Sequence, residues 1–362
     1  MMQKPKLVRL NALALASLMG TGALVAAGTA QAFETELYGI VDVGLESFSG
    51  DGTGLIFPGM NSVAGNSDDK DFTLSNGMQS RIGLRGGERL NEHVELTYNL
   101  EYAVDVLVED SGFTDSSIGT RLGWVALGGD WGTVKTGTQW MALYEFGAWN
   151  TYRNDVHGYG GYYYTTGLLR DSLAFGFRQS SAISYQYGSA WGHSDPFAFN
   201  LTFGVGEGED NESGISSVQA AAQYSFNNQV SVNAVYVQEI VDVPDGVPDN
   251  EATLWNVGAR WTITPEFELG VNYSNVDDDA GDERDAYTLA GFFNFGQGWD
   301  ASLGIGAGSA DLDEVADMDL NVYGFVRHSF TDRTSARFEF EYVELDNDAD
   351  DTLGMFALQH SF

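Results

Sequence analysis

Apolar and polar residues alternate one by one along much of the chain. In VELTYNLEY every second residue is apolar, and the residues between are polar or charged; the two sets are Val94, Leu96, Tyr98, Leu100 and Tyr102, and Glu95, Thr97, Asn99 and Glu101. The same alternation recurs in VSVNAVY (230–236), WNVGARWTI (255–263), EFELGVNYS (266–274) and ARFEFEY (336–342). It predicts β-strands with one apolar and one polar face, and no segment shows a convincing helical period.

The connections between these strands alternate between tight turns and long acidic loops. The tight turns are at 227–228, 264–265, 296–298 and 331–333, and the acidic loops are at 206–214, 240–251, 276–284, 310–319 and 346–351. This layout is typical of a transmembrane antiparallel β-barrel with short periplasmic turns and longer extracellular loops. The pattern predicts an all-β fold of about 16 strands, centred near residues 41, 82, 98, 123, 135, 183, 201, 222, 234, 258, 271, 290, 303, 324, 339 and 357.

One connection, residues 141–177, is far longer than the others. It includes GYGGYYYTTG and contains no strand pattern. A loop of this length in a compact fold is usually functional. We therefore expect it to fold into the lumen and narrow a passage that would otherwise be wide.

The chain ends in LGMFALQHSF, an alternating strand whose last residue is Phe362. If this strand closes the barrel, Phe356, Leu358 and Phe362 face lipid, and Phe362 joins an aromatic girdle at the periplasmic rim. His360 shares that face. The alternative is an edge strand of a soluble β domain, which would expose these rings and invite aggregation.

The N-terminal segment has the features of a cleaved signal peptide. Lys4, Lys6 and Arg9 precede an apolar run, and Ala30-Gln31-Ala32 forms a small-x-small cleavage site. Residues 1–32 are thus expected to be removed, so that the barrel spans 33–362 and Phe33 stands at its start; a membrane-anchoring helix is the alternative. Beyond this segment no apolar run reaches the roughly 20 residues of a spanning helix, so a membrane-embedded chain must form a closed barrel.

Composition and charge exclude several classes of function. There are 52 acidic and 17 basic residues and no Cys, with a formal net charge of −35. A surface this acidic repels nucleic acid, and the lack of Cys removes disulfides and thiolate metal sites. No hydrolase motif is present, so we expect neither an enzyme nor a cofactor. Asp346, Asp348 and Asp350 have the spacing of the first ligands of a calcium loop but lack its Gly and distal Glu, so solvated loop acids are the simpler interpretation.

Several ordered motifs resemble those of the general, trimeric porins of Gram-negative outer membranes. They are ELYGIVDVGLE (36–46), SRIGLRGGERL (80–90), TRLGWVALGGDWGTVKTG (120–137), YEFG (144–147), RQSSAISYQY (178–187) and the terminal strand ending in Phe. The resemblance implies a homotrimer in the outer membrane that lets small hydrophilic solutes diffuse passively. It also implies that Arg81, Arg121 and Arg178 line the wall of the constriction and that Glu145 and Asp155 face them from the loop.

The strand pattern independently favours lumen positions for these arginines. An arginine on the lipid face near the membrane midplane would cost about 2–4 kcal/mol. Arg81 and Arg85 alternate with Ile82 and Leu84, so Arg85 joins the predicted wall set. Arg121 precedes Leu122 and Trp124, which we expect to face outward. The alternative for the arginines is simple pairing with lumen acids such as Glu95 or Glu101.

The predicted lumen acids are Asp42, Glu46, Glu95 and Glu101, and they favour a weak to moderate preference for cations. Two other functions stay open. One is a substrate-selective channel, in which Tyr159–Tyr164 would form a stacking surface for sugars. The other is a non-channel surface protein or secreted β-rich hydrolase. The expected partners are outer-membrane lipid and lipopolysaccharide, with divalent cations as optional bridges.

Overall fold

The computed structural model describes residues 31–32, 35–56, 70–76, 80–107, 118–151, 157–166, 177–190, 195–207, 213–241, 250–278, 281–311 and 315–362. The strands are β1 (Gln31–Ala32), β2 (Glu36–Gly50), β3 (Lys70–Ser75), β4 (Arg81–Arg89), β5 (Glu95–Val104), β6 (Ile118–Gly129), β7 (Gly132–Trp140), β8 (Arg178–Tyr187), β9 (Phe197–Glu207), β10 (Ser213–Phe226), β11 (Val230–Val241), β12 (Asn250–Thr264), β13 (Phe267–Asp278), β14 (Glu283–Gly296), β15 (Trp299–Ala310), β16 (Met318–Thr331), β17 (Thr334–Leu345) and β18 (Asp350–Ser361). Within the described residues, three short helices interrupt this order: η1 (Leu143–Gly147), η2 (Ala148–Thr151) and α2 (Gly160–Thr166).

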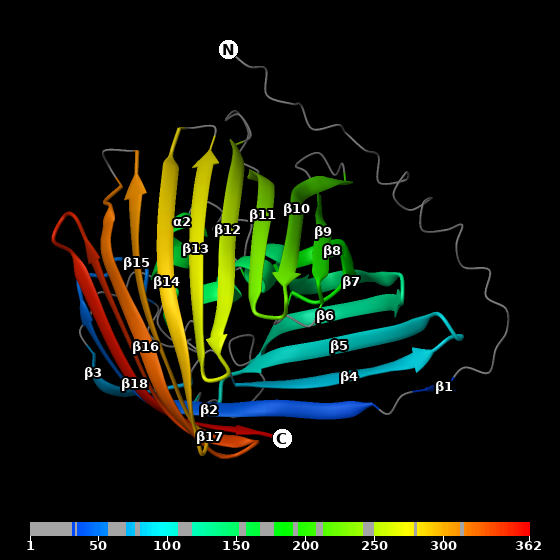
Figure 1. Ribbon diagram of the computed structural model, residues 1–362, viewed down its shortest axis with the longest axis horizontal. Coiled ribbons are helices and arrows are strands. Elements are labelled where there is room, and N and C mark those ends of the chain that lie inside the picture. Colours follow the sequence, from blue (N-terminus) through cyan, green and yellow to red (C-terminus); the bar gives the residue numbers. More distant parts are fainter. Residues whose placement is uncertain are drawn as a thin grey trace.

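Sixteen of these strands, β2 and β4 to β18, form a closed antiparallel ring (Figure 1). The ring closes because β18 pairs with β2 and β9 pairs with β10. β2 pairs with β4 along its first half and with the short β3 along its second half. The predicted barrel is confirmed, and each predicted strand centre falls within one ring strand. The short β1 and β3 were not predicted.

The last residue completes the seam of the barrel. The backbone N–H of Gly39 donates to the carbonyl oxygen of Phe362 at 3.1 Å, and the N–H of Phe362 donates back at 3.0 Å. The Phe362 ring lies over Gly39, where an added methyl group would overlap it. The His360 ring nitrogen Nδ1 lies 2.9 Å from the Thr334 hydroxyl. Phe33 lies outside the described residues.

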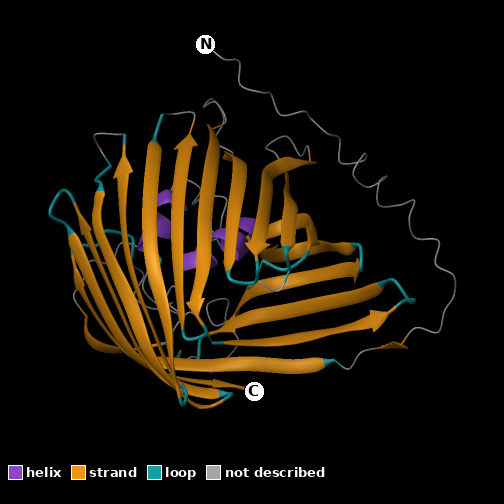
Figure 2. Cartoon of the chain, viewed as in Figure 1, coloured by secondary structure: helices purple, strands orange, loops and turns teal. Residues whose placement is uncertain are grey.

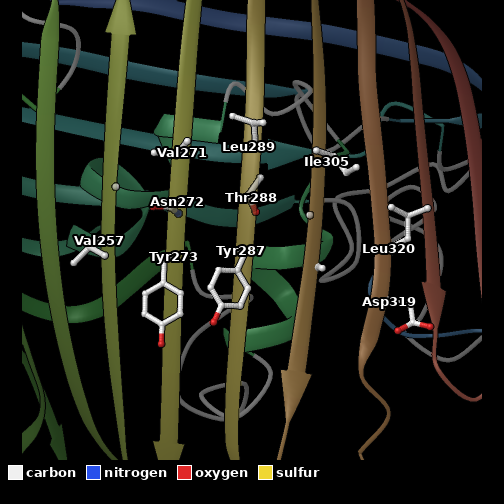
Figure 3. A pocket seen from close by; sticks show the side chains of 13 residues that line it. Val257, Val271, Asn272, Tyr273, Tyr287, Thr288, Leu289, Ile305, Asp319 and Leu320 are labelled. Atoms are coloured by element: carbon white, nitrogen blue, oxygen red, sulfur yellow. The ribbon is translucent and has the colours of Figure 1, made fainter.

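The outer face of the barrel carries the apolar half of the alternation. Trp255, Val257 and Trp261 are each about half exposed there, whereas Leu254 and Asn256 on the inner face are buried. Val271, Leu289 and Ile305 border a depression of 660 Å³ on this outer face, and Figure 3 shows their side chains in front of the strands with the loop helices behind. Such an apolar band is what a lipid-facing surface requires.

The segment 141–177 is called the lumen loop below. Its described parts, 141–151, 157–166 and 177, lie inside the ring, where Figure 2 shows their helices behind the strands. The sequence predicted no helix here, because helices of four to seven residues are too short to show a 3.6-residue period. Met141, Leu143 and Phe146 are almost fully buried in one cluster with wall residues such as Val235 and Leu254. Burying one such side chain stabilises by about 1.5–3 kcal/mol, so packing holds the loop against the wall. No helix in the described part of the chain is long and apolar enough to cross a membrane.

Candidate channel-lining site

Three arginines from neighbouring strands gather around one glutamate on the inner wall. Glu101 of β5 accepts from Arg121 Nε of β6 at 2.8 Å, and its other oxygen lies 3.7 Å from Arg81 Nε of β4. Arg178 of β8 is close enough for the charges of Arg121, Glu101 and Arg81 to act on it. Arg121 is buried, whereas Arg81 and Arg178 are partly exposed. The described wall therefore brings three guanidinium groups together around one carboxylate. The ion pairing of wall arginines with Glu101, which the sequence left open as an alternative, is present for Arg121 and Arg81.

A β-bulge directs Arg121 inward. The register of β5 and β6 shifts where Glu101 pairs with Leu122 and Tyr102 pairs with Thr120, which leaves Arg121 as the extra residue. Leu122 and Trp124 consequently share the inner face with Glu101 and Asn99. The prediction that they face outward was wrong, because a one-residue insertion reverses the parity of every later residue in the strand.

Aromatic rings connect this arginine group to the start of the lumen loop. The Arg178 and Arg121 guanidinium carbons lie 5.3 and 5.9 Å from the centre of the Trp140 ring. Trp140 in turn stacks on Tyr144 of η1 with ring centres 4.5 Å apart. Cation–π contact of this kind holds guanidinium groups flat against a ring. The start of the loop thus helps to orient the arginines.

Two other predicted residues lie away from this group. Arg85 is four residues nearer the end of β4, about 13 Å from Arg81 along the strand, and forms an exposed ion pair with Glu36 at 2.7 Å. Glu95 begins β5, opposite Arg89 in the register and about 20 Å along the strand from Glu101. Both belong to the inner wall near one rim and not to the arginine group.

Glu145 lies in η1 and is buried. Burial raises the pKa of Glu145 above its ordinary value, although the positive charge of Lys135 on β7 works against this. Lys135 itself lies over Trp124, with Nζ 5.0 Å from the ring centre. The basic group that acts on Glu145 is thus Lys135 rather than one of the three arginines. Asp155, the second predicted loop carboxylate, lies outside the described residues.

A second cluster of charges lies on β2 and β17. Arg337 is almost completely buried, with Nη2 donating to Asp42 Oδ2 at 2.8 Å and Nε donating to Glu339. Gln359 of β18 donates to the same Asp42 oxygen at 3.1 Å. Sequence reasoning placed Asp42 in the lumen but missed Arg337. The signal was present, because Arg337 has the same strand parity as Glu339 and Glu341.

This second cluster binds the backbone of the lumen loop. Glu341 accepts from the N–H groups of Gly158 at 2.7 Å and Gly160 at 3.0 Å, and from the side chain of Asn321 at 3.0 Å. Glu339 accepts from the backbone N–H of His157 at 3.2 Å. The predicted lumen acid Glu46 lies 3.8 Å from the His157 ring. No strand or helix period marks His157 in the sequence, so its role could not be predicted.

Between the two charged clusters, the wall behind the loop carries uncharged amides. Gln219 of β10 accepts from the N–H of Ala142 at 2.9 Å, and Asn233 of β11 accepts from Asn150. On the other side, Tyr323 of β16 donates to the carbonyl oxygen of Thr151 at 2.8 Å. At Gly160 an added Cβ atom would lie 2.8 Å from the Asn321 side chain, so glycine lets the loop backbone approach β16 closely.

The tyrosines of the lumen loop pack on one another. The rings of Tyr159, Tyr162 and Tyr163 all contact Phe177, with the Tyr162 and Phe177 rings stacked at 5.5 Å. Tyr159, Tyr163 and Tyr164 are buried, and only Tyr162 is partly exposed. A continuous stacking surface would require several of these rings to face the passage, so this packing disfavours the sugar-selective alternative.

The acids at the extracellular rim are engaged in local hydrogen bonds. Asp351 accepts from the N–H groups of Gly52 and Thr53, and Asp346 accepts from the N–H of Asp317. Among the described residues, no group of three or more His, Asp or Glu side chains is arranged to hold a metal ion.

The comparison with protein families agrees with this architecture. The family model for Gram-negative porins matches residues 14–349. The chain belongs to the Gram-negative porin family. A porin is an outer-membrane channel, which accords with the closed barrel and its charged inner wall. No curated protein sequence matches the chain significantly.

Solved structures share the fold of this porin at low sequence identity. A loop-deletion mutant of OmpT from Vibrio cholerae has a TM-score of 0.67 at 19% identity, covering 92% of this chain and 100% of that chain. The anion-selective porin from Comamonas acidovorans has a TM-score of 0.66 at 16% identity, with coverage of 91% and 100%. OmpF of Salmonella typhi, in complex with daunomycin, has a TM-score of 0.68 at 15% identity, with coverage of 91% and 98%.

Proposed function

We propose that this porin forms a water-filled channel through which small hydrophilic solutes and ions diffuse passively across the outer membrane. The observation that carries the proposal is the position of the described parts of the lumen loop, which lie against β10–β17 inside a closed ring, while three arginines of β4, β6 and β8 line another part of the inner wall. Charges at a narrow passage order water and orient dipolar solutes. Polar molecules then pass more easily than apolar ones.

We further propose a weak preference for cations. The excess of acidic residues and the acidic extracellular loops support it. However, Asp42, Glu339 and Glu341 are buried in hydrogen bonds, so they contribute less field to the passage than their number suggests. Salt screens exposed charges within about 8 Å at physiological ionic strength and about 30 Å at 0.01 M. The preference should therefore be stronger in dilute salt.

A homotrimer is proposed on the likeness to OmpT of Vibrio cholerae, one structure of which is described as a trimer form, with a TM-score of 0.65 at 18% identity. Export by cleavage of residues 1–32 remains the proposal made from the sequence.

Contact with lipopolysaccharide is proposed for the exposed acids near Asp348, with divalent cations as bridges. Replacing Asp346 and Asp348 by Asn should then reduce the stabilisation of the folded protein by Ca²⁺ in lipopolysaccharide-containing vesicles.

The channel function is tested by osmotic swelling of liposomes that contain the purified porin. Small uncharged sugars should enter and swell the vesicles, and the rate should fall smoothly as the solute grows. Vesicles made with heat-unfolded protein are the control. A rate that is high for one sugar and negligible for others of equal size would favour the substrate-selective alternative, and no swelling with any solute would refute the channel.

A further inference from the structure

His157 belongs to the lumen loop, and its side chain is buried against two strands of the wall, β2 and β17. Its ring nitrogen Nδ1 lies 3.2 Å from Glu339 Oε2 of β17, which also accepts the backbone N–H of His157. Its other nitrogen, Nε2, lies 3.8 Å from Glu46 Oε2 of β2. The ring is only 2% exposed, so bulk water has little access to it.

The geometry favours a ring that carries a proton on both nitrogens. A carboxylate is only an acceptor, so Nδ1 must donate to Glu339. In a neutral ring Nε2 would then present its lone pair to an oxygen of Glu46. In the protonated ring Nε2 presents an N–H instead, and the repulsion becomes attraction.

The charges around the ring also favour its protonated form. Among the described residues, the charged groups that act on the ring are Glu46 on β2 and Glu339 and Glu341 on β17, while β16 contributes the uncharged Asn321, which binds Glu341. Within the described part of the chain, three carboxylates thus act on the ring, and one of them, Glu339, is shared with Arg337. Burial opposes the charged ring, but the hydrogen bond and charge of Glu339 with the charges of Glu46 and Glu341 outweigh it and raise the pKa of His157.

His157 begins the second described stretch of the loop that contacts the wall, after the first stretch at 141–151. Gly158 and Gly160 follow it and donate to Glu341, and α2 then packs across β13 to β16. A change in the charge of the His157 ring therefore strengthens or weakens the attachment of residues 157–160 to the wall. The wall lies directly behind these residues, so a released segment can move only into the lumen.

We propose that His157 is a positioning residue of the lumen loop, which holds residues 157–160 against β2 and β17 while its ring is protonated and releases them when the proton is lost. The proposal rests on the channel function proposed above. The anchor is present in full below about pH 6.5, the ordinary value of a free histidine, and is lost as the pH rises through the higher pKa of the docked ring.

The test is single-channel recording in planar bilayers from pH 5.5 to 9.5. Wild-type conductance should fall, and closing events should become more frequent, with a midpoint above about pH 6.5. His157→Gln should show the high-pH behaviour already at pH 5.5 and lose the pH dependence. His157→Lys, whose ammonium group titrates near about 10.4, should keep the low-pH behaviour of the wild type throughout most of the range. His93→Gln, in the exposed turn at 91–93, is the matched control and should keep the wild-type profile.

A wild-type channel with the same conductance and closing frequency at every pH would overturn the proposal, as would His157→Gln with the wild-type profile. If the variants do not fold, NMR titration of the His157 ring in the wild type decides: a midpoint at or below about 6.5 overturns it. Failure of the wild type to conduct at any pH would refute the channel function and the inference with it.

Discussion

Replacing Arg337 by Met should strongly destabilise the barrel. The Arg337 side chain is 1% exposed and joins Asp42 to Glu339, and both of these carboxylates are completely buried. Met fills a similar volume but removes the guanidinium from both carboxylates; because Glu339 keeps its contacts with His157, the loss falls mainly on Asp42, which keeps the Gln359 amide. Removing one partner of a buried ion pair typically costs about 3–5 kcal/mol, because the remaining charge is neither paired nor solvated. The unfolding equilibrium constant should thus rise by roughly a hundredfold or more.

The measurement is urea unfolding of the porin in lipid vesicles, followed by the fluorescence of its 8 tryptophans. Arg85→Met is the matched control. Its ion pair with Glu36 has a distance of 2.7 Å, close to the 2.8 Å between Arg337 and Asp42, but both side chains are more than half exposed. Exposed pairs contribute little, so the control should leave the midpoint essentially unchanged. The triple variant Arg337→Met, Asp42→Asn and Glu339→Gln should recover part of the loss. Equal midpoints for Arg337→Met and wild type, or equal losses for Arg337→Met and Arg85→Met, would refute the reasoning.

Three further perturbations have expected outcomes. Gly39→Val should lower the yield of the folded, heat-modifiable form on gels, because the new side chain overlaps the Phe362 ring and approaches the Arg81 carbonyl oxygen; a normal yield would contradict the seam described here. Gly160→Val should alter single-channel conductance, because its side chain would meet Asn321 and push α2 from the wall; an unchanged conductance would argue against that contact. Arg81→Gln with Arg178→Gln should raise the cation-to-anion permeability ratio measured from reversal potentials, and Arg85→Gln, farther from the group, should change it less. The reverse order would contradict the assignment of the arginine group.

The strands were predictable because each must present alternate residues to two different solvents. In 255–263 the outward Trp255, Val257 and Trp261 could be identified without any knowledge of neighbouring strands. Alternation fails where the chain inserts a residue, as at Arg121. No local signal marks that bulge, since it depends on the pairing of β6 with β5.

The candidate site was only partly predictable for the same reason. Arg81, Arg121 and Arg178 are strand residues, and their spacing together with the resemblance to porins led to them. His157 lies in a loop without a period, and its importance comes from Glu46 and Glu339, more than a hundred residues away on either side. Contacts of that kind follow from the closure of the ring and not from local sequence.

The most direct test of a closed barrel with a wet interior is the conductance of single molecules in a planar bilayer. The purified, folded porin at about pH 5.5, below the ordinary pKa of histidine, should produce discrete current steps that are proportional to voltage and increase with salt concentration. Folded protein that inserts into the bilayer but leaves the current at the level of bare lipid would contradict the structure proposed for the passage.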